Sequence, residues 1–206
     1  MYEFGSQAWL DAFVAAINGS KAYEEAAKDW EGDFYFILEP GGPVDVYGVR
    51  GSAEILCGVP GIERLAWYGP GPEETYVDRR ARPVGVYDTS VSANYFRYSQ
   101  PQETGNKVEV RWATITNGTG AGLLAAGLPL LSVNALHHSA EDMDQAGHHH
   151  HMKARAETFL NLDWRQMGLG GDDSWGALPL EKHRIEAAPL SYRFRPRPIT
   201  AGDSPM

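Results

Sequence analysis

The chain has one cysteine, Cys57, among its 206 residues, so it cannot form an internal disulfide bond. Its first residues contain neither the charged segment nor the apolar run of a secretory signal, and we therefore expect a cytoplasmic protein. Positive charge is also scarce, because 18 Lys and Arg stand against 27 Asp and Glu, a formal net charge of −9. This balance argues against nucleic acid and anionic membranes as partners.

Charged residues are absent between Arg111 and Glu141. The apolar part of this stretch, residues 121–133, is shorter than the roughly 20 residues that span a bilayer. It also contains two glycines and a proline, which favour turns and sheet edges over a helix. The stretch therefore predicts two buried strands around a turn near residues 117–118, and no membrane span.

The chain also lacks the regular alternation of strands and helices that builds a (β/α)8 barrel, an architecture of about 250 residues. It has no internal repeat and no low-complexity segment before its last eight or so residues. A hydrophobic fraction of 43% with 11% aromatic residues is enough for a packed core. The length suits one domain, or one domain with a small appendage.

Three segments alternate apolar and polar residues with the period of a half-buried strand, at 108–114, 160–164 and 190–194. In the first, Val108, Val110 and Trp112 are expected on one face. Short strands separated by Gly, Pro and Asn turns predict a mainly β chain, an antiparallel β-sandwich. One brief helix is expected at 139–145, with Ser139 as its cap.

The opening of the chain is different. Residues 6–30 predict two short helices, and 34–38 predict a buried strand closed by 40–43. Three segments resemble the start of bacterial sterol-carrier-like lipid-binding domains: F-G-S-Q-A-W-L at 4–10, I-N-G-S at 17–20 and A-A-K-D-W-E-G-D-F at 26–34. Such a start, without the rest of a lipid tunnel, is either an incomplete lipid-binding element or a helical segment that packs on the later part of the chain.

Residues 67–79 gather aromatic and acidic residues around two Gly-Pro steps. We assign this segment to folding, with Trp67 and Tyr68 buried and Asp78 paired with Arg79. The His148–His151 run predicts a solvated loop or strand start. Adventitious Zn²⁺ or Ni²⁺ binding is an alternative, but adjacent ligands fit a structural zinc site poorly, and we expect no physiological metal site.

One glycine-rich loop combines flexible, polar and aromatic residues: Gly168, Gly170, Gly171, Asp172, Asp173, Ser174 and Trp175. Glycines allow positive φ angles and a sharp reversal. The Asp and Ser side chains can bond nearby backbone N–H groups and brace the loop. Two interpretations of Trp175 are open: it packs back on its own sheet, or its exposed face stacks on a ligand.

The surrounding segment L-N-L-D-W-R-Q-M-G-L-G-G-D-D-S-W-G at 160–176 resembles the C-terminal domain of the large bacterial β-galactosidases, retaining glycosidases whose catalytic barrel lies upstream. Four other segments fit that domain in the same order: P-G-I-E-R-L-A-W-Y-G-P-G-P-E-E-T-Y-V-D-R at 60–79, P-Q-E-T-G-N-K-V-E-V-R-W at 101–112, L-H-H-S-A-E-D-M at 136–143 and S-Y-R-F-R-P-R-P at 191–198. The resemblance covers roughly residues 58–198.

This resemblance implies a fold and a division of the chain. Residues 59–198 would form a truncated β-sandwich of the galactose mutarotase-like supersandwich type, beginning partway through the usual domain. Residues 1–45 would be the helical start with one strand, 46–58 a seam, and 199–206 a flexible tail.

The resemblance also implies a role for the loop. In that family the Trp of this loop reaches into the active site and stacks against the sugar, which would make Trp175 the one direct substrate contact. Gly170, Gly171, Asp172, Asp173 and Ser174 would support the loop. Retaining hydrolysis needs two carboxylates about 5–5.5 Å apart. Adjacent Asp172 and Asp173 would point apart in an extended loop, so we expect no catalytic residue and no activity of the chain alone.

Some β-galactosidases of this family consist of a large and a small chain. The resemblance therefore implies a hetero-oligomer in which this chain docks on a catalytic large chain and completes its site for terminal β-D-galactosides, in carbohydrate metabolism. Mg²⁺ and Na⁺ are expected only in that partner. The alternatives are a non-catalytic carbohydrate- or lipid-binding module, or a fusion or truncation product with no activity of its own.

Overall fold

The computed structural model describes residues 34–38, 44–45, 48–49, 52–57, 61–171, 173, 175–185 and 192–203, with the isolated positions 8 and 15. The helices expected at 6–30 and the segments that resemble a lipid-binding domain lie almost entirely outside these residues. Asp172 and Ser174 also lie outside them. Those expectations therefore stay predictions.

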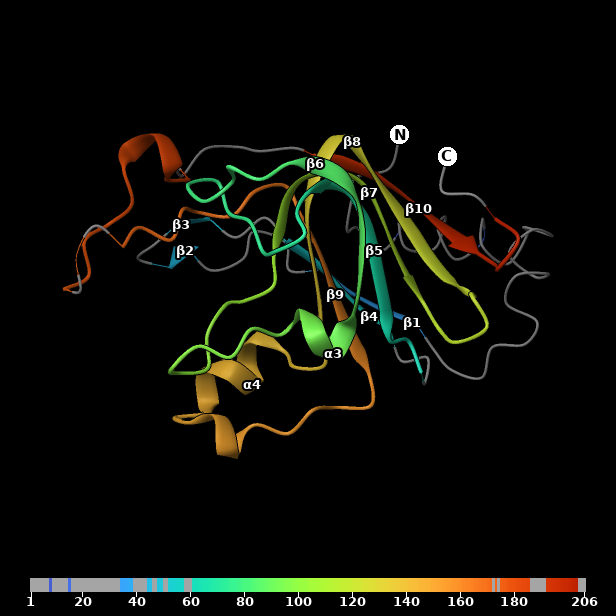
Figure 1. Cartoon of the computed structure of the whole chain (residues 1–206), viewed down its shortest axis with the longest axis horizontal. Coiled ribbons are helices and arrows are strands. Elements are labelled where there is room, and N and C mark those ends of the chain that lie inside the picture. Colours follow the sequence, from blue (N-terminus) through green and yellow to red (C-terminus); the bar gives the residue numbers. More distant parts are fainter. Residues whose placement is uncertain are drawn as a thin grey trace.

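The described elements are nearly all strands (Figure 1). They are β1 (Phe34–Leu38), β2 (Val44–Asp45), β3 (Gly48–Val49), β4 (Ser52–Cys57), β5 (Arg64–Pro70), β6 (Val84–Ser90), β7 (Lys107–Thr116), β8 (Gly122–Leu136), β9 (Thr158–Asp163) and β10 (Arg193–Ile199). The helices are α3 (Val91–Asn94), α4 (Ala140–Gln145) and the 3₁₀ turns η1 (His149–His151) and η2 (Glu181–His183). The prediction of a mainly β chain is confirmed.

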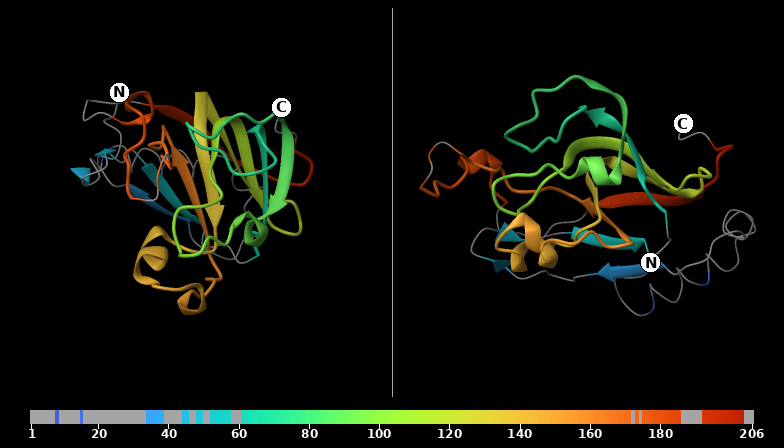
Figure 2. Two further views of the ribbon diagram at one scale, coloured as in Figure 1. Left: turned by 60° about the vertical axis from the view of Figure 1, so that its left-hand side comes forward. Right: turned by 60° about the horizontal axis from the view of Figure 1, so that its bottom comes forward.

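Eight strands form one antiparallel sheet in the order β1-β4-β9-β8-β7-β5-β6, with β10 also paired to β8, while β2 and β3 form a small separate ladder. Strand β8 organises this sheet because its two halves have different neighbours. Its first half, from Gly122 to Leu128, pairs with β10, and its second half, from Ser132 to Leu136, pairs with β9. The sheet therefore divides along β8, and Figure 2 shows β1 and β4 in a different layer from β10.

The pairing of β7 with β8 is interrupted at the point where this division occurs. Val110 lies opposite Leu131, yet Trp112 lies opposite Ala126, so β8 carries extra residues between two close positions of β7. On β7 itself, Glu109 has a φ of 56°. Such β-bulges bend a strand and increase its twist, which is how one long strand serves both layers.

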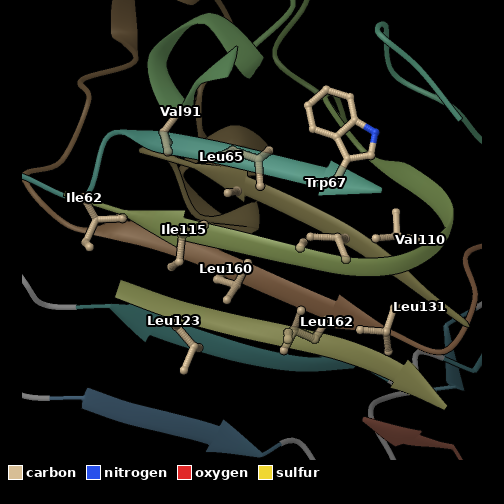
Figure 3. Close-up of a cluster of buried hydrophobic side chains, with 14 residues drawn as sticks. Ile62, Leu65, Trp67, Val91, Val110, Ile115, Leu123, Leu131, Leu160 and Leu162 are labelled. Atoms are coloured by element: carbon tan, nitrogen blue, oxygen red, sulfur yellow. The ribbon is translucent and has the colours of Figure 1, made fainter. Parts of the chain in front are cut away.

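The core lies between the layers and draws side chains from β5, β7, β8 and β9 (Figure 3). Its members are Ile62, Leu65, Trp67, Val91, Val110, Ala113, Ile115, Leu123, Ala125, Leu131, Val133, Ala135, Leu160 and Leu162, with Tyr87, Tyr192 and Phe194 packed against them. Burying each large apolar side chain contributes about 1.5–3 kcal/mol. The core thus joins segments from both sides of the β8 bend.

Several sequence predictions hold in detail. The three alternating segments overlap β7, β9 and β10, the turn after β7 falls at residues 117–121, and β1 coincides with the expected strand at 34–38. Ser139 caps α4 through a full capping box, since its side chain accepts from Asp142 and Asp142 accepts from the Ser139 backbone.

Other details of the prediction are wrong. The bulge turns Trp112 away from the core, onto the outer face where its ring lies 6.4 Å from that of Tyr68. Tyr68 is 36% exposed because neighbouring strand residues point to opposite faces, and its neighbour Trp67 takes the core side. Trp164 lies beyond the end of β9 and is partly exposed.

Strand β4 lies within the segment interpreted as a seam. It pairs with β1, placing Phe34 opposite Cys57, and with β9, placing Ser52 opposite Asp163. The sheet is therefore continuous across the expected boundaries at 45 and 58. At the other end Ile199 is buried as the last residue of β10. The division into domains stays a prediction.

Candidate functional site

The glycine-rich loop connects β9 to β10 and projects from one end of the sheet, at the left of Figure 1. Its base is closed by hydrogen bonds that cross between its two sides. The Gly168 N–H donates to the His183 carbonyl at 2.8 Å, and Arg165 Nη2 donates to the Lys182 carbonyl at 3.0 Å. Residues 165–168 and 182–183 are thus hydrogen-bonded to each other at the base of the loop.

Trp175 stands on this loop with 91% of its surface exposed. Beside it, the Asp173 carboxylate accepts hydrogen bonds from the Trp175 N–H at 2.8 Å and from the Ala177 N–H at 3.2 Å. These bonds favour the charged form and hold the pKa of Asp173 below its ordinary value. The backbone on both sides of Trp175 is therefore braced while its indole faces solvent, and Trp175 takes no part in the core.

The other loop residues behave differently from one another. Gly170 and Gly171 have φ angles of 72° and 97°, which a side chain would disfavour. The Asp173 carboxylate is occupied by backbone N–H groups, so its contacts are those of a turn. The structure brings Gly170, Gly171, Asp173 and Trp175 together in one loop.

A residue that sequence reasoning paired elsewhere lies at the base of the loop. Asp78 Oδ2 accepts a hydrogen bond from the Gly170 N–H at 2.9 Å, across 92 residues of sequence. Arg79, its expected partner, instead donates to Glu74 Oε1 at 2.7 Å. No local pattern links Asp78 to the loop, because the contact depends on the tertiary fold alone.

The loop is apolar as well as exposed. Leu169, Leu178 and Leu180 each expose about half of their surface, and Trp164 at the loop entrance is partly exposed. Polar contacts fix the backbone beneath them, where Arg184 Nε donates to the Pro179 carbonyl at 2.6 Å. Exposed apolar side chains gathered around a braced loop are typical of a surface that another molecule covers.

The histidine run forms the η1 turn and not a strand start. The rings of His148, His150 and His151 contact one another, whereas His149 Nδ1 lies 3.0 Å from the Tyr95 hydroxyl. In the part of the chain that the structure describes, no group of three or more His, Cys, Asp and Glu side chains is arranged to hold a metal ion. None of the described helices is long and apolar enough to cross a membrane.

The known proteins that this chain is similar to are β-galactosidases. The family model described as "Beta galactosidase small chain" matches residues 57–195. A β-galactosidase of Priestia megaterium is 42% identical over 117 residues, covering 56% of this chain and 11% of that protein. β-Galactosidase BgaC of Bifidobacterium adolescentis is 40% identical over 135 residues, covering 64% of this chain and 13% of that protein.

A β-galactosidase of Streptococcus thermophilus is also similar, 33% identical over 132 residues that make up 63% of this chain and 13% of that protein. The chain therefore spans only a small fraction of the length of these relatives. The matched region nevertheless runs from β4 into β10 and includes the whole Trp175 loop. Because the family model covers well over half of its residues, the chain belongs to the β-galactosidase small-chain family.

Proposed function

We propose that this chain docks on a β-galactosidase catalytic chain and completes its sugar site, with Trp175 as the one direct contact to a terminal β-D-galactoside. The observation that carries the proposal is the 91% exposure of Trp175 on a braced loop. An aromatic face held in solvent is suited to stacking on the apolar face of a sugar. The catalytic carboxylates, and any Mg²⁺ or Na⁺, would belong to the partner chain.

The apolar surroundings of Trp175 support docking at this loop. If Trp175 reaches a sugar site on the partner, its neighbours Leu178 and Leu180 must lie at the contact between the two chains. Both side chains are half-exposed in the isolated chain and would be covered by docking. A hydrophobic centre of this kind carries most of the affinity in many protein interfaces.

Mixing the chain with a catalytic partner tests this proposal. The partner is the Priestia megaterium β-galactosidase lacking the 117-residue segment that this chain matches. We expect neither component alone to hydrolyse a nitrophenyl β-galactoside, and the mixture to do so. Since burying a leucine contributes about 1.5–3 kcal/mol, Leu178→Asp or Leu180→Asp should raise the dissociation constant roughly 10- to 150-fold.

The matched control for the docking variants is Val86→Asp. Val86 is also an exposed apolar residue, but it lies on β6, outside the loop, and should leave assembly unchanged. Activity of the chain alone would contradict the proposal, as would equal weakening of assembly by all three substitutions.

Trp175→Ala tests the sugar contact in the assembled enzyme. Stacking is worth about 0.5–1.5 kcal/mol, so kcat/KM should fall roughly 2- to 12-fold. Trp175→Phe keeps an aromatic face and should retain most of the activity. Because the indole makes no core contact, the melting temperature of Trp175→Ala should match that of the original chain. A large drop in melting temperature with unchanged kinetics would show a structural residue instead.

A further inference from the structure

We infer that Asp78 is a positioning residue, whose carboxylate holds the base of the Trp175 loop and so sets where the indole stands. The consequence for catalysis rests on the proposed function of Trp175, whereas the anchoring itself is a property of this chain. Asp78 and the loop that it contacts are far apart in sequence.

The segment that carries Asp78 is fixed to the body of the domain. Tyr76 and Arg79 exchange backbone hydrogen bonds of 3.2 and 2.9 Å, which closes a tight turn with Asp78 near its tip. The Tyr76 side chain is buried. The turn that carries Asp78 is therefore held in place against the domain.

Glu74 strengthens that base. Its buried carboxylate accepts from Arg79 Nη1 at 2.7 Å and from the Gly105 N–H at 2.8 Å, and it also bonds the Tyr98 hydroxyl. Burial raises the pKa of Glu74, but the bonds from Tyr98, Gly105 and Arg79 outweigh burial and hold it below its usual value. The turn is thus tied to the segment that leads into β7.

The loop meets Asp78 through backbone that only glycine allows to approach so closely. Asp78 Oδ2 lies 2.9 Å from the Gly170 nitrogen, and a Cβ added to Gly168 would lie 2.6 Å from the same oxygen. That Cβ would also lie 2.9 Å from the His183 Cβ. Both glycines are therefore packed around one carboxylate oxygen.

The bond to Gly170 acts on both sides of Trp175. A Cβ on Gly170 would lie 3.1 Å from the Ala177 carbonyl oxygen, so the chain entering and leaving the tip of the loop meets at Gly170. Trp175 lies on the short segment enclosed by this contact, which Asp173 braces from within. Holding Gly170 in place therefore holds the described part of the tip, including Trp175.

The second oxygen of Asp78 indicates that the residue is more than a source of stability. Asp78 Oδ1 is buried and has no hydrogen-bond partner in the described structure. Such groups call for an explanation, and accurate placement of a functional loop supplies one here.

Hydrogen exchange of the Gly170 amide, measured by NMR on the full chain without a partner, tests the anchor directly. A bond to a charged acceptor is strong, so Asp78→Ala should speed exchange at Gly170 by roughly 10- to 100-fold. Asp78→Asn keeps the shape without the charge and should show a smaller increase. The matched control is Asp88→Ala, which removes an exposed carboxylate paired with Arg64 on neighbouring strands and should leave Gly170 unchanged.

A double-mutant cycle in the assembled enzyme tests positioning. Asp78→Ala alone should lower kcat/KM by about the same factor as Trp175→Ala, roughly 2- to 12-fold, and should have no further effect once Trp175 is alanine. Unchanged exchange at Gly170 in a folded Asp78→Ala or Asp78→Asn chain would overturn the anchor. Independent, multiplying effects of the two substitutions would overturn positioning. If Trp175→Ala itself leaves kinetics unchanged, the proposed function fails, and the exchange result still decides whether Asp78 holds the loop.

Discussion

Replacing Trp67 by alanine is expected to lower the free energy of unfolding by about 3–5 kcal/mol, because a fully buried Trp leaves a large cavity when it is truncated. Trp67 is 1% exposed and its Nε1 donates to the Pro70 carbonyl at 3.0 Å. Its ring also lies 5.6 Å from that of Tyr87 and 4.8 Å from Lys107 Nζ. The substitution removes all of these contacts together.

Urea unfolding of the isolated chain measures this loss. Trp164→Ala is the matched control, because Trp164 is partly exposed beyond the end of β9, and its removal should cost much less. Equal losses for the two variants would contradict the assignment of Trp67 to the core. The comparison also separates burial from the general effect of losing an indole.

Trp67 and Tyr68 show how far the sequence alone can go. It correctly predicts a structural segment with a buried Trp67, but it also predicts that Tyr68 is buried. Adjacent residues of one strand point to opposite faces, and the cross-strand partners of Tyr68, which are Val86 and Trp112, lie on the outer face with it. Which of the two faces the core depends on the strands packed against β5, and single-sequence periodicity does not contain that information.

The prediction for strand β7 fails for a related reason. Its alternation predicts one face for Val108, Val110 and Trp112, and the first two are indeed buried. A register shift between Val110 and Trp112 then follows, and Ala113 takes the core side in place of Trp112. A bulge arises from pairing between strands, so it leaves little trace in the alternation of one of them.

The candidate loop can be found from its own sequence, but its anchor cannot. Glycines, aspartates and a Trp in succession predict a braced turn but leave open whether the Trp packs on its sheet or faces solvent, and the structure decides for the exposed indole. Sequence alone pairs Asp78 with Arg79, the nearest opposite charge. In the fold Arg79 satisfies the buried carboxylate of Glu74, where the need for a counter-charge is greater, and this leaves Asp78 to the loop.

The same buried network contains a lysine, and we expect it to make stability depend on pH. Lys107 is 2% exposed, and its Nζ donates to Asn94 Oδ1 at 2.7 Å and to the Gly105 carbonyl at 2.6 Å. Burial lowers the pKa of Lys107 to about 8, although the charges of Glu74 and Glu103 oppose the shift. Its ordinary value is 10.5.

The direction of the effect depends on these two values. Between pH 8 and 10.5 the unfolded chain keeps the proton on Lys107 while the folded chain releases it, so the unfolded state binds more protons and the free energy of unfolding rises with pH. The slope is at most about 1.4 kcal/mol per pH unit. Burial also raises the pKa of Tyr76. Above the ordinary Tyr pKa the unfolded chain therefore loses this proton while the folded chain keeps it, which lowers the free energy of unfolding, so the rise should end near pH 10.

Urea unfolding at about pH 8, 8.75 and 9.5 measures this rise. Lys107→Met removes the titrating group while keeping a long apolar stem, so the rise should disappear in that variant. Lys153→Met, which removes an exposed lysine, should leave it intact. If the original chain loses stability across this range, or if Lys107→Met keeps the full rise, then Lys107 does not lose its proton in the folded chain. The ammonium would then stay charged through its bonds to Asn94 and Gly105, and the network around Glu74 would have to stabilise a buried cation throughout this range.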